Sequence, residues 1–409
     1  MSIVKSYGAQ IFGPFLFLII YFMPTTLEPI QQKFLAIFYL VVFGWLFTRI
    51  PLYVTGFVGV GLSIFFNIGK PVEIFANFGH PIIFLFLAGF LLARAFNNVG
   101  LDRRISLYLL TRPFIKGSFT RLVFTLMAIT TMFTMWISNT ATTAMMLPLV
   151  LGVLDSLKIQ SRKMISFILI SIAYASSIGG IATPIGSTPN IIALGMLSEF
   201  IDLKISFLEW MAYSLPISLV FLAVLFVLTH LQIKKAKIDF DNAFLVNQYQ
   251  ILPYLSKAEI FTAVIFLTTV FCWMLPSFLK LAGISLSWNL DPGAVGLFLA
   301  SFLFLTPEGD NKILKSTDIK TIDWSSLMLF GSGLAFGKLL FDLGLAQMAG
   351  DFLTSTISGL PVLVIFIIVF GFVIFSTELT SNTATANILI PIMISLAGSL
   401  QISPFFFSL

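Results

Sequence analysis

Two short clusters of hydroxyl and amide side chains recur in the two halves of this sequence. One cluster, Ser138 to Thr140, lies in the segment WISNTATTAMMLP, and the other, Ser381 to Thr383, lies in LTSNTATANILIP. Hydroxyl and side-chain amide groups both donate and accept hydrogen bonds, so they suit carboxylate oxygens on one side and a dehydrated sodium ion on the other. The alternative is that small polar residues only cap helices and allow close packing. Their recurrence in both halves favours binding.

The composition places these clusters in a membrane protein. The chain is 58% hydrophobic and 10% charged, whereas soluble domains are roughly a quarter charged. It is therefore expected to be an integral, multi-pass membrane protein of all-α fold class that contacts membrane lipids. The net charge of +5 requires no nucleic-acid partner, because cytoplasmic loops of membrane proteins are enriched in Lys and Arg.

The apolar runs predict the spans that position the clusters. Runs that could cross a bilayer lie at about 11–23, 33–47, 51–68, 81–96, 164–198, 207–229, 258–276, 292–305 and 325–341. The first is interpreted as a membrane span and not as a cleaved signal. Two further runs, 122–154 and 361–400, are too long for one span of about 20 residues, and each holds a polar cluster near its middle. This pattern predicts two half-helices that meet at a tip.

Charges beside the long runs indicate re-entrant hairpins. Both flanks of 122–154 are basic and therefore expected on the cytoplasmic side; these residues are Arg103, Arg104, Arg112, Lys116, Arg121, Lys158, Arg162 and Lys163. Such a run enters and returns on the same side, with its tip buried in protein or lining a cavity. The run 361–400 follows Asp342 and Asp351 with no basic residue after Lys338, so its hairpin is expected to enter from outside.

The two halves also match ahead of the tips. Gly89 and Gly100 in the first half correspond to Gly333 and Gly344 in the second, at the same spacing. Counting crossings from a cytoplasmic N-terminus gives the two copies opposite orientations, an arrangement typical of secondary transporters, whose sites lie at the repeat interface. The predicted domains are a first span (1–32), a first repeat (33–230), a cytoplasmic linker (231–257) and a second repeat (258–409).

A third polar stretch, SSIGGIATPIGSTPN, occupies 176–190 inside the run 164–198. An interior proline costs a helix about 3 kcal/mol and a glycine about 1 kcal/mol, so this span should be broken there. Unwound backbone carbonyls at membrane depth can coordinate a small cation, while the N-terminus of the next half-helix can attract an anion. The broken span is therefore a third candidate part of one site.

The paired Ser-Asn-Thr tips and the Gly-Ser-x-Pro-Asn loop after the first resemble the divalent anion/sodium symporter family of di- and tricarboxylate transporters. The resemblance implies an elevator-type transporter, a homodimer and two sodium sites. The sodium ligands that it implies are Thr134, Ser138, Asn139 and Gly186 in the first site, and Thr377, Thr380 and Asn382 in the second. The implied substrate-binding residues are Ser138, Asn139, Thr140, Ser187, Thr188, Ser381, Asn382 and Thr383.

The resemblance also exposes a departure. The first repeat continues after Thr140 through a broken span and another crossing, whereas the chain ends at Leu409 soon after Thr383. The second repeat is therefore expected to be truncated and the second sodium site incomplete. In that case the chain is a fragment or a truncated gene product.

The leading hypothesis is sodium-driven uptake of a small dicarboxylate such as succinate, malate or fumarate across the cell membrane. Neither tip contains Arg or Lys, so bound cations, hydroxyls and helix dipoles would have to neutralise the dianion. Sodium-independent exchange, and efflux or antiport of another anion or of sodium, remain alternatives; proton antiport would rely on Glu378. An intramembrane enzyme is disfavoured, because no His, Cys or acidic pair recurs near the tips.

Overall fold

A computed structural model describes residues 2–405 apart from 235–237, 239–241, 285–287, 289, 306, 309–310 and 358–359. The described chain is helical except for one antiparallel pair of two-residue strands, β1 (Pro307–Glu308) and β2 (Asn311–Lys312). It divides into two compact units. Unit 1 comprises Met1–Ile83, Thr188–Lys204 and Asp323–Leu409, and unit 2 comprises Phe84–Ser187 and Ile205–Ile322.

Six helical segments of the described chain are long and apolar enough to cross a membrane. They are Pro29–Phe47, Pro71–Asn98, Arg162–Ile181, Phe207–Ile233, Lys257–Leu281 and Trp324–Asp342. Shorter apolar helices accompany them, among them the two that precede the polar clusters. A helix pairs its backbone N–H and C=O groups with one another, so these segments can lie in hydrocarbon without unsatisfied polar groups. The predicted all-α polytopic membrane fold is confirmed.

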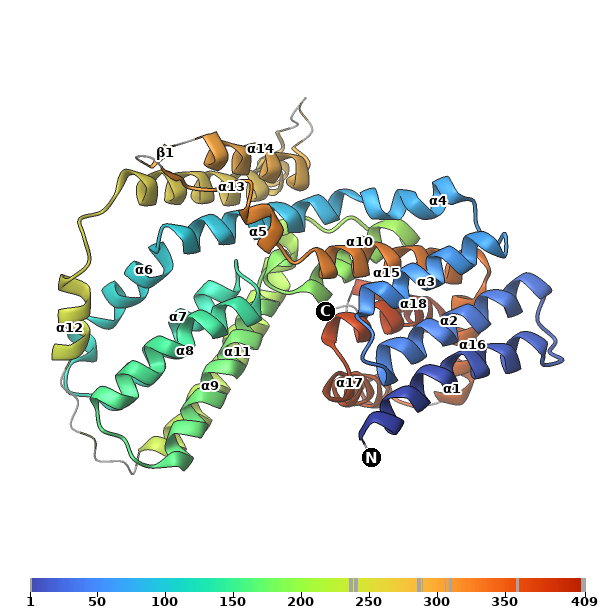
Figure 1. The fold of residues 1–409 in the computed structure, drawn as a ribbon, viewed down its shortest axis with the longest axis horizontal. Coiled ribbons are helices and arrows are strands. Elements are labelled where there is room, and N and C mark those ends of the chain that lie inside the picture. Colours follow the sequence, from blue (N-terminus) through green and yellow to red (C-terminus); the bar gives the residue numbers. More distant parts are fainter. Residues whose placement is uncertain are drawn as a thin grey trace. The chain divides into compact units, whose positions relative to one another are not determined.

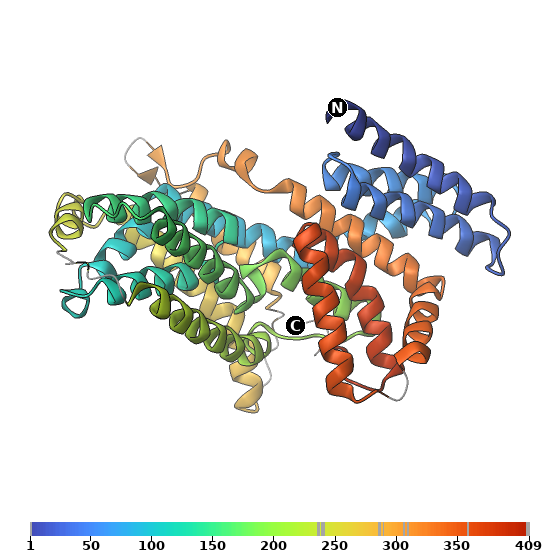
Figure 2. The same cartoon turned by 90° about the horizontal axis from the view of Figure 1, so that it is seen from below.

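Unit 1 is built around α15 (Trp324–Asp342), which packs against α3, α10, α16 and α18. Its other helical elements are α1 (Ser2–Phe22), α2 (Pro29–Phe47), α3 (Leu52–Phe65), α4 (Pro71–Ala76), η1 (Asn77–Gly79), α10 (Thr188–Ile201), α16 (Leu345–Ile357), α17 (Val362–Leu379) and α18 (Asn382–Ser399). Figure 2 shows α16 to α18 as neighbouring orange and red helices. Phe34, Ile37 and Phe336 are fully buried between α2, α3 and α15.

Unit 2 surrounds α9 (Arg162–Ile181), which packs against α7 (Phe119–Thr134), α8 (Asn139–Ser156) and α11 (Phe207–Ile233). Figure 1 shows these four helices running side by side. The remaining elements are α5 (Pro81–Asn98, from Phe84 in this unit), α6 (Leu101–Leu110), η2 (Pro113–Ile115), η3 (Pro184–Gly186), α12 (Ala243–Gln250), α13 (Lys257–Leu281), α14 (Pro292–Leu305) and η4 (Asp318–Thr321), together with the strand pair. Leu122, Val150 and Ile168 are fully buried in its core.

Local sequence explains where many helices begin. Serine hydroxyls accept a hydrogen bond from the first helical turn at Ser118 of α7, Ser138 of α8, Ser161 of α9 and Ser381 of α18, which satisfies a backbone donor that the helix itself leaves free. Gly100 and Gly344 take left-handed φ values of 73° and 71°, which glycine adopts without steric cost. Each of the two glycines lies between paired helices, α5 and α6 or α15 and α16, at equivalent places in the proposed repeat.

Arg94 and Lys338, which lie at equivalent positions of the predicted repeat, are both ion-paired. In unit 2, Arg94 of α5 donates to Asp318 over 2.9 Å, and Asn98 donates to the other oxygen of this carboxylate. In unit 1, the ammonium group of Lys338 on α15 lies 2.7 Å from Glu199 on α10. Sequence spacing relates the two cations, but only the tertiary structure identifies their partners.

Asp318 should make the fold acid-sensitive. Burial acts to raise the pKa of this carboxyl, but hydrogen bonds from the Lys315 amide, Arg94 and Asn98 outweigh burial and hold its pKa below the ordinary value. A lowered pKa stabilises the fold above the unfolded value of about 3.9, and this contribution is lost as pH falls through the folded pKa. At pH 7 we expect Asp318→Asn to lower the free energy of unfolding by about 1–3 kcal/mol.

The measurement is thermal unfolding of wild type and Asp318→Asn in detergent from pH 7 down to pH 3. The difference between the two melting temperatures should shrink as the wild-type carboxyl becomes protonated. A difference that stays constant over this range would show that Asp318 contributes no pH-dependent stability.

Candidate functional site

The first polar cluster lies where α7 and α8 meet. Helix α7 ends at Thr134, the chain leaves the helical ladder, and Ser138 caps α8 by accepting a hydrogen bond from the amide of Ala141. Asn139 and Thr140 are the first residues of α8. The tip therefore brings the C-terminal carbonyls of one helix beside the N-terminal amides of the next, and these ends carry partial negative and partial positive charge respectively.

Hydrogen bonds connect this tip to α9 and to the non-helical segment after α9. The hydroxyl of Thr131 donates to the carbonyl of Ala175 over 3.1 Å, and that of Ser176 donates to the carbonyl of Asn139 over 2.9 Å. Past the end of α9, the hydroxyl of Thr183 donates to the carbonyl of Met135. Three hydroxyl groups thus tie the end of α7 and the start of α8 to the broken span.

Glycines let these segments approach so closely that side chains are excluded. A Cβ atom on Gly179 would lie closer than 3.0 Å to the Thr134 hydroxyl and the Thr131 carbonyl, an approach that real Cβ atoms essentially never show. A Cβ atom on Gly180 would meet the Asn139 amide at equally short range, and one on Gly186 would lie 2.6 Å from the Gly180 carbonyl and 2.8 Å from the Thr134 carbonyl. The predicted ligands Thr134, Asn139 and Gly186 are therefore brought together here.

This cluster fits a sodium ion by its chemistry. The side-chain oxygen of Asn139 is buried without a hydrogen-bond partner, and leaving such a group unpaired costs about 1–3 kcal/mol. It faces Gly180 at the C-terminal end of α9. The carbonyl of Gly180 and the carbonyl of Thr134, at the end of α7, both lie close to Gly186. Carbonyl oxygens at the C-terminal ends of broken helices are the groups with which transporters coordinate sodium.

The second polar cluster, in unit 1, also begins a helix with a serine cap. Helix α17 ends at Leu379, Thr380 is extended, and Ser381 caps α18 by accepting from the amide of Ala384 over 3.1 Å. Ser381 and Asn382 are exposed, and Thr383 is partly buried. The hydroxyl of Thr380 lies 2.6 Å from that of Thr385. A cap and two facing hydroxyls therefore define this tip.

Thr377 and Glu378 lie in the last turns of α17. The Thr377 hydroxyl donates to the Ile374 carbonyl of its own helix over 2.9 Å. Glu378 is exposed, and no salt bridge involving it is found in the part of the chain that the structure describes. Thr377 therefore stands one turn before the tip with its hydroxyl directed along α17.

Each unit holds part of the predicted site. Unit 2 contains Thr134, Ser138, Asn139, Thr140, Gly186 and Ser187, and unit 1 contains Thr188, Thr377, Thr380, Ser381, Asn382 and Thr383. The boundary falls between Ser187, which ends the η3 turn, and Thr188, which begins α10. The stretch expected to be broken is non-helical or 3₁₀-helical from 182 to 187. The re-entrant entry of both hairpins stays a prediction.

Sequence reasoning missed Asn387 on α18. Its side-chain nitrogen donates to the Thr383 carbonyl over 3.0 Å, while its side-chain oxygen is buried without a hydrogen-bond partner and faces Gly333 of α15. The signal was present as one amide inside the apolar segment ANILIP. Its partner glycine could not be identified from the sequence, because nothing local relates α15 to α18.

We expect Gly333→Ala to disrupt unit 1. The added Cβ atom would lie closer than 3.0 Å to the Asn387 amide, so the buried Asn387 side chain or the packing of α15 against α18 must shift, at a cost of about 1–3 kcal/mol from overpacking. Thermal unfolding in detergent should show a lower melting temperature. Gly371→Ala on α17 is the control, because nothing lies within 4 Å of its added Cβ atom. Equal melting temperatures for the two variants would contradict the close α15–α18 contact.

Comparisons with known proteins show the family of this chain. The family model described as "Sodium:sulfate symporter transmembrane region" matches residues 8–409. An uncharacterized transporter of Haemophilus influenzae is 32% identical over 376 residues, which cover 91% of this chain and 78% of the relative. The sodium-dependent dicarboxylate transporter SdcS of Staphylococcus saprophyticus is 30% identical, covering 96% and 79%, and that of Staphylococcus aureus (strain USA300) is 29% identical, covering 96% and 78%.

Proposed function

Because the chain belongs to the sodium:sulfate symporter family, whose model matches residues 8–409, we propose that it takes up small dicarboxylates together with sodium ions. The family is one of membrane transporters and not of enzymes. The observation that carries the proposal is the buried, unpartnered oxygen of Asn139 against Gly180, whose carbonyl lies close to Gly186 together with the carbonyl of Thr134. The relatives that are sodium-dependent dicarboxylate transporters support the substrate class.

In this proposal a first sodium ion is held by Thr134, Ser138, Asn139 and Gly186. A bound ion supplies positive charge beside the substrate, which no Arg or Lys in either tip can supply. The Thr134 carbonyl and the Asn139 side-chain oxygen would be among its ligands, and the absence of a Cβ atom at Gly186 keeps the space beside the Gly180 and Thr134 carbonyls open. A second ion is assigned to Thr377, Thr380 and Asn382, at the C-terminal end of α17.

Amide and hydroxyl donors at three helix N-termini would then hold the substrate carboxylates. We assign these contacts to Ser138, Asn139, Thr140, Ser187 and Thr188, and to Ser381, Asn382 and Thr383 of the second tip. The N-terminal ends of α8, α10 and α18 favour negative charge. Bound sodium lowers the electrostatic cost of a dianion in the same site, so sodium and succinate should each raise the affinity for the other.

Transport by the proposed scheme moves the site between the two membrane faces. We propose an elevator-type mechanism in a homodimer, with a cytoplasmic N-terminus and with the inverted repeat supplying the two hairpins. The basic loops before and after α7 and α8 support this orientation.

The test is uptake of labelled succinate into proteoliposomes that contain the chain, with an inward sodium gradient or with choline replacing sodium. Sodium-dependent uptake supports the proposal. Succinate counterflow that persists in choline would instead indicate exchange. Labelled sulfate in parallel tests the other anion named by the family: sodium-driven sulfate uptake without succinate uptake would overturn the dicarboxylate assignment.

A further inference from the structure

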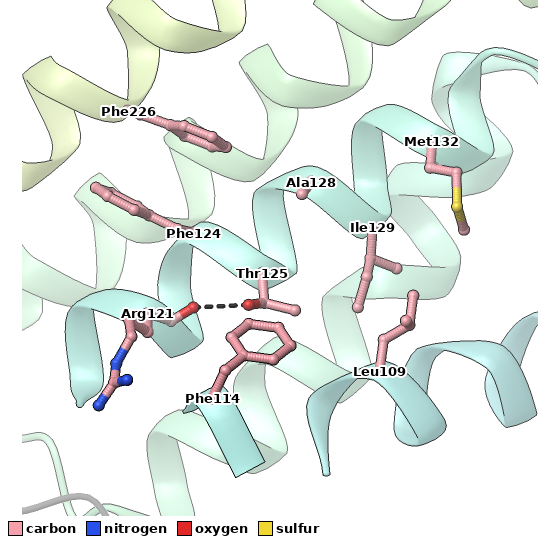
Figure 3. Close-up of a pocket in the computed structure, with 9 residues that line it drawn as sticks. All are labelled: Leu109, Phe114, Arg121, Phe124, Thr125, Ala128, Ile129, Met132 and Phe226. Carbon is pink, nitrogen blue, oxygen red and sulfur yellow. Dashed lines mark hydrogen bonds between the residues drawn. The ribbon is translucent and has the colours of Figure 1, made fainter. Parts of the chain in front are cut away.

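A groove of about 440 Å³ lies in unit 2 along α7. Figure 3 shows its lining: a stripe of α7 side chains from Arg121 to Met132, faced by Leu109 of α6, Phe114 of η2 and Phe226 of α11. Its volume falls within the range of roughly 300–1,000 Å³ of small-molecule sites. The lining is almost entirely apolar apart from Thr125, whose hydroxyl donates to the Arg121 carbonyl, and the Arg121 side chain.

The stretch of α7 that lines the groove is about as long as one leaflet of a bilayer is thick. Arg121 and Met132 stand eleven positions apart on α7, which at a rise of 1.5 Å per residue is about 16 Å. Half of a hydrocarbon core of about 30 Å is about 15 Å. Phe114 and Met132 are exposed, so the groove opens along its length to the surroundings of the unit. An acyl chain that enters at Arg121 would end near Met132.

The end of the groove at Arg121 is cationic. Arg121 donates to the Lys116 carbonyl over 2.8 Å, and the guanidinium of Arg112 lies 3.6 Å over the ring of Tyr108. Among the residues that the structure describes, no acidic side chain forms a salt bridge with Arg112, Lys116 or Arg121. A guanidinium that has no carboxylate partner and lies beside an apolar groove matches a phosphate joined to an acyl chain, and guanidinium groups bind phosphate through several N–H donors.

We propose that this groove binds one anionic glycerophospholipid of the leaflet that faces the basic loop, with its phosphate at Arg121 and one acyl chain along α7. The rings of Phe124 and Phe226 stack with their centroids 4.7 Å apart. They form one wall of the groove for the acyl chain (Figure 3). The lipid would bridge α6, α7 and α11. The site is separate from the proposed sodium and carboxylate residues.

The test is lipid binding to the purified full chain in detergent after removal of copurified lipid. Native mass spectrometry counts bound phosphatidylglycerol or phosphatidylcholine with the same acyl chains. The wild type should prefer phosphatidylglycerol, and Arg121→Gln should reduce that preference about fivefold, because each cation near an anionic lipid contributes roughly that factor. Arg121→Lys should retain most of the preference.

A second pair of variants tests the acyl chain. Ala128 is exposed on α7 in the groove, so Ala128→Leu should weaken binding of both lipids alike. Ala173→Leu, at an exposed alanine of α9 outside the groove, should bind as the wild type does. Should Ala128→Leu not fold, the two Arg121 variants still decide the proposal.

Three outcomes would overturn the proposal: a wild type with no lipid preference, normal binding by Ala128→Leu, or displacement of the lipid by inorganic phosphate alone. The last would show a site for the head group without the acyl chain. None of these results depends on succinate uptake, so failure here and failure of the proposed function are distinguishable.

Discussion

Replacing Gly179 with alanine should abolish sodium-dependent uptake and lower the melting temperature. In the interior of a helix with free space around the residue, replacing glycine with alanine would stabilise the helix by about 0.8–1 kcal/mol. Here the added Cβ atom would overlap the Thr134 hydroxyl and the backbone of Thr131. Overpacking costs about 1–3 kcal/mol, and more where backbone must shift. Helices α7 and α9 must therefore separate, which moves the Thr134 carbonyl away from Gly186.

Gly152→Ala is the matched control, because it lies on α8 in the same unit and the nearest atom to its added Cβ is 3.8 Å away on Phe244. It should keep wild-type uptake with equal or greater stability. Both variants are compared by succinate uptake into proteoliposomes and by thermal unfolding in detergent. Wild-type uptake by Gly179→Ala would mean that the close contact of α7 with α9 is not needed for the sodium site.

Replacing Asn139 with leucine should separate stability from activity. The side-chain oxygen of Asn139 is buried and unpartnered, so without sodium its loss removes a cost of about 1–3 kcal/mol. The variant should then be at least as stable as the wild type in choline. Its sodium affinity should fall roughly tenfold to a hundredfold, because an interaction of a polar partner with a charged group contributes about 1.5–3 kcal/mol.

The measurement is the melting temperature in detergent as sodium is titrated against choline at constant ionic strength. Sodium that binds only the folded state raises the wild-type melting temperature, and this rise should shift to much higher sodium concentration in Asn139→Leu. Asn247→Leu, at an exposed amide on α12, should respond as the wild type does. An unchanged sodium response in Asn139→Leu would remove Asn139 from the proposed sodium site.

The sequence alone determined the membrane class, the helical fold and the family. Each rests on composition or on local pattern. An apolar run of about 20 residues must form a helix in hydrocarbon. The Ser-Asn-Thr motif predicts the start of a helix, because its serine can cap the first turn. The break at 182–187 follows equally from glycines and a proline that act on their own backbone. Local chemistry of this kind can be interpreted without knowing any neighbour in space.

The tertiary structure decided which groups meet. Gly180 was visible in a polar stretch, but only packing of α9 against the tip places it against Asn139. Asn387 against Gly333, and Arg94 beside Asp318, likewise join segments that no periodicity relates. Such contacts depend on how whole helices pack, and many different pairings are compatible with the same apolar pattern. The same packing buries the side-chain oxygens of Asn139 and Asn387 without hydrogen-bond partners.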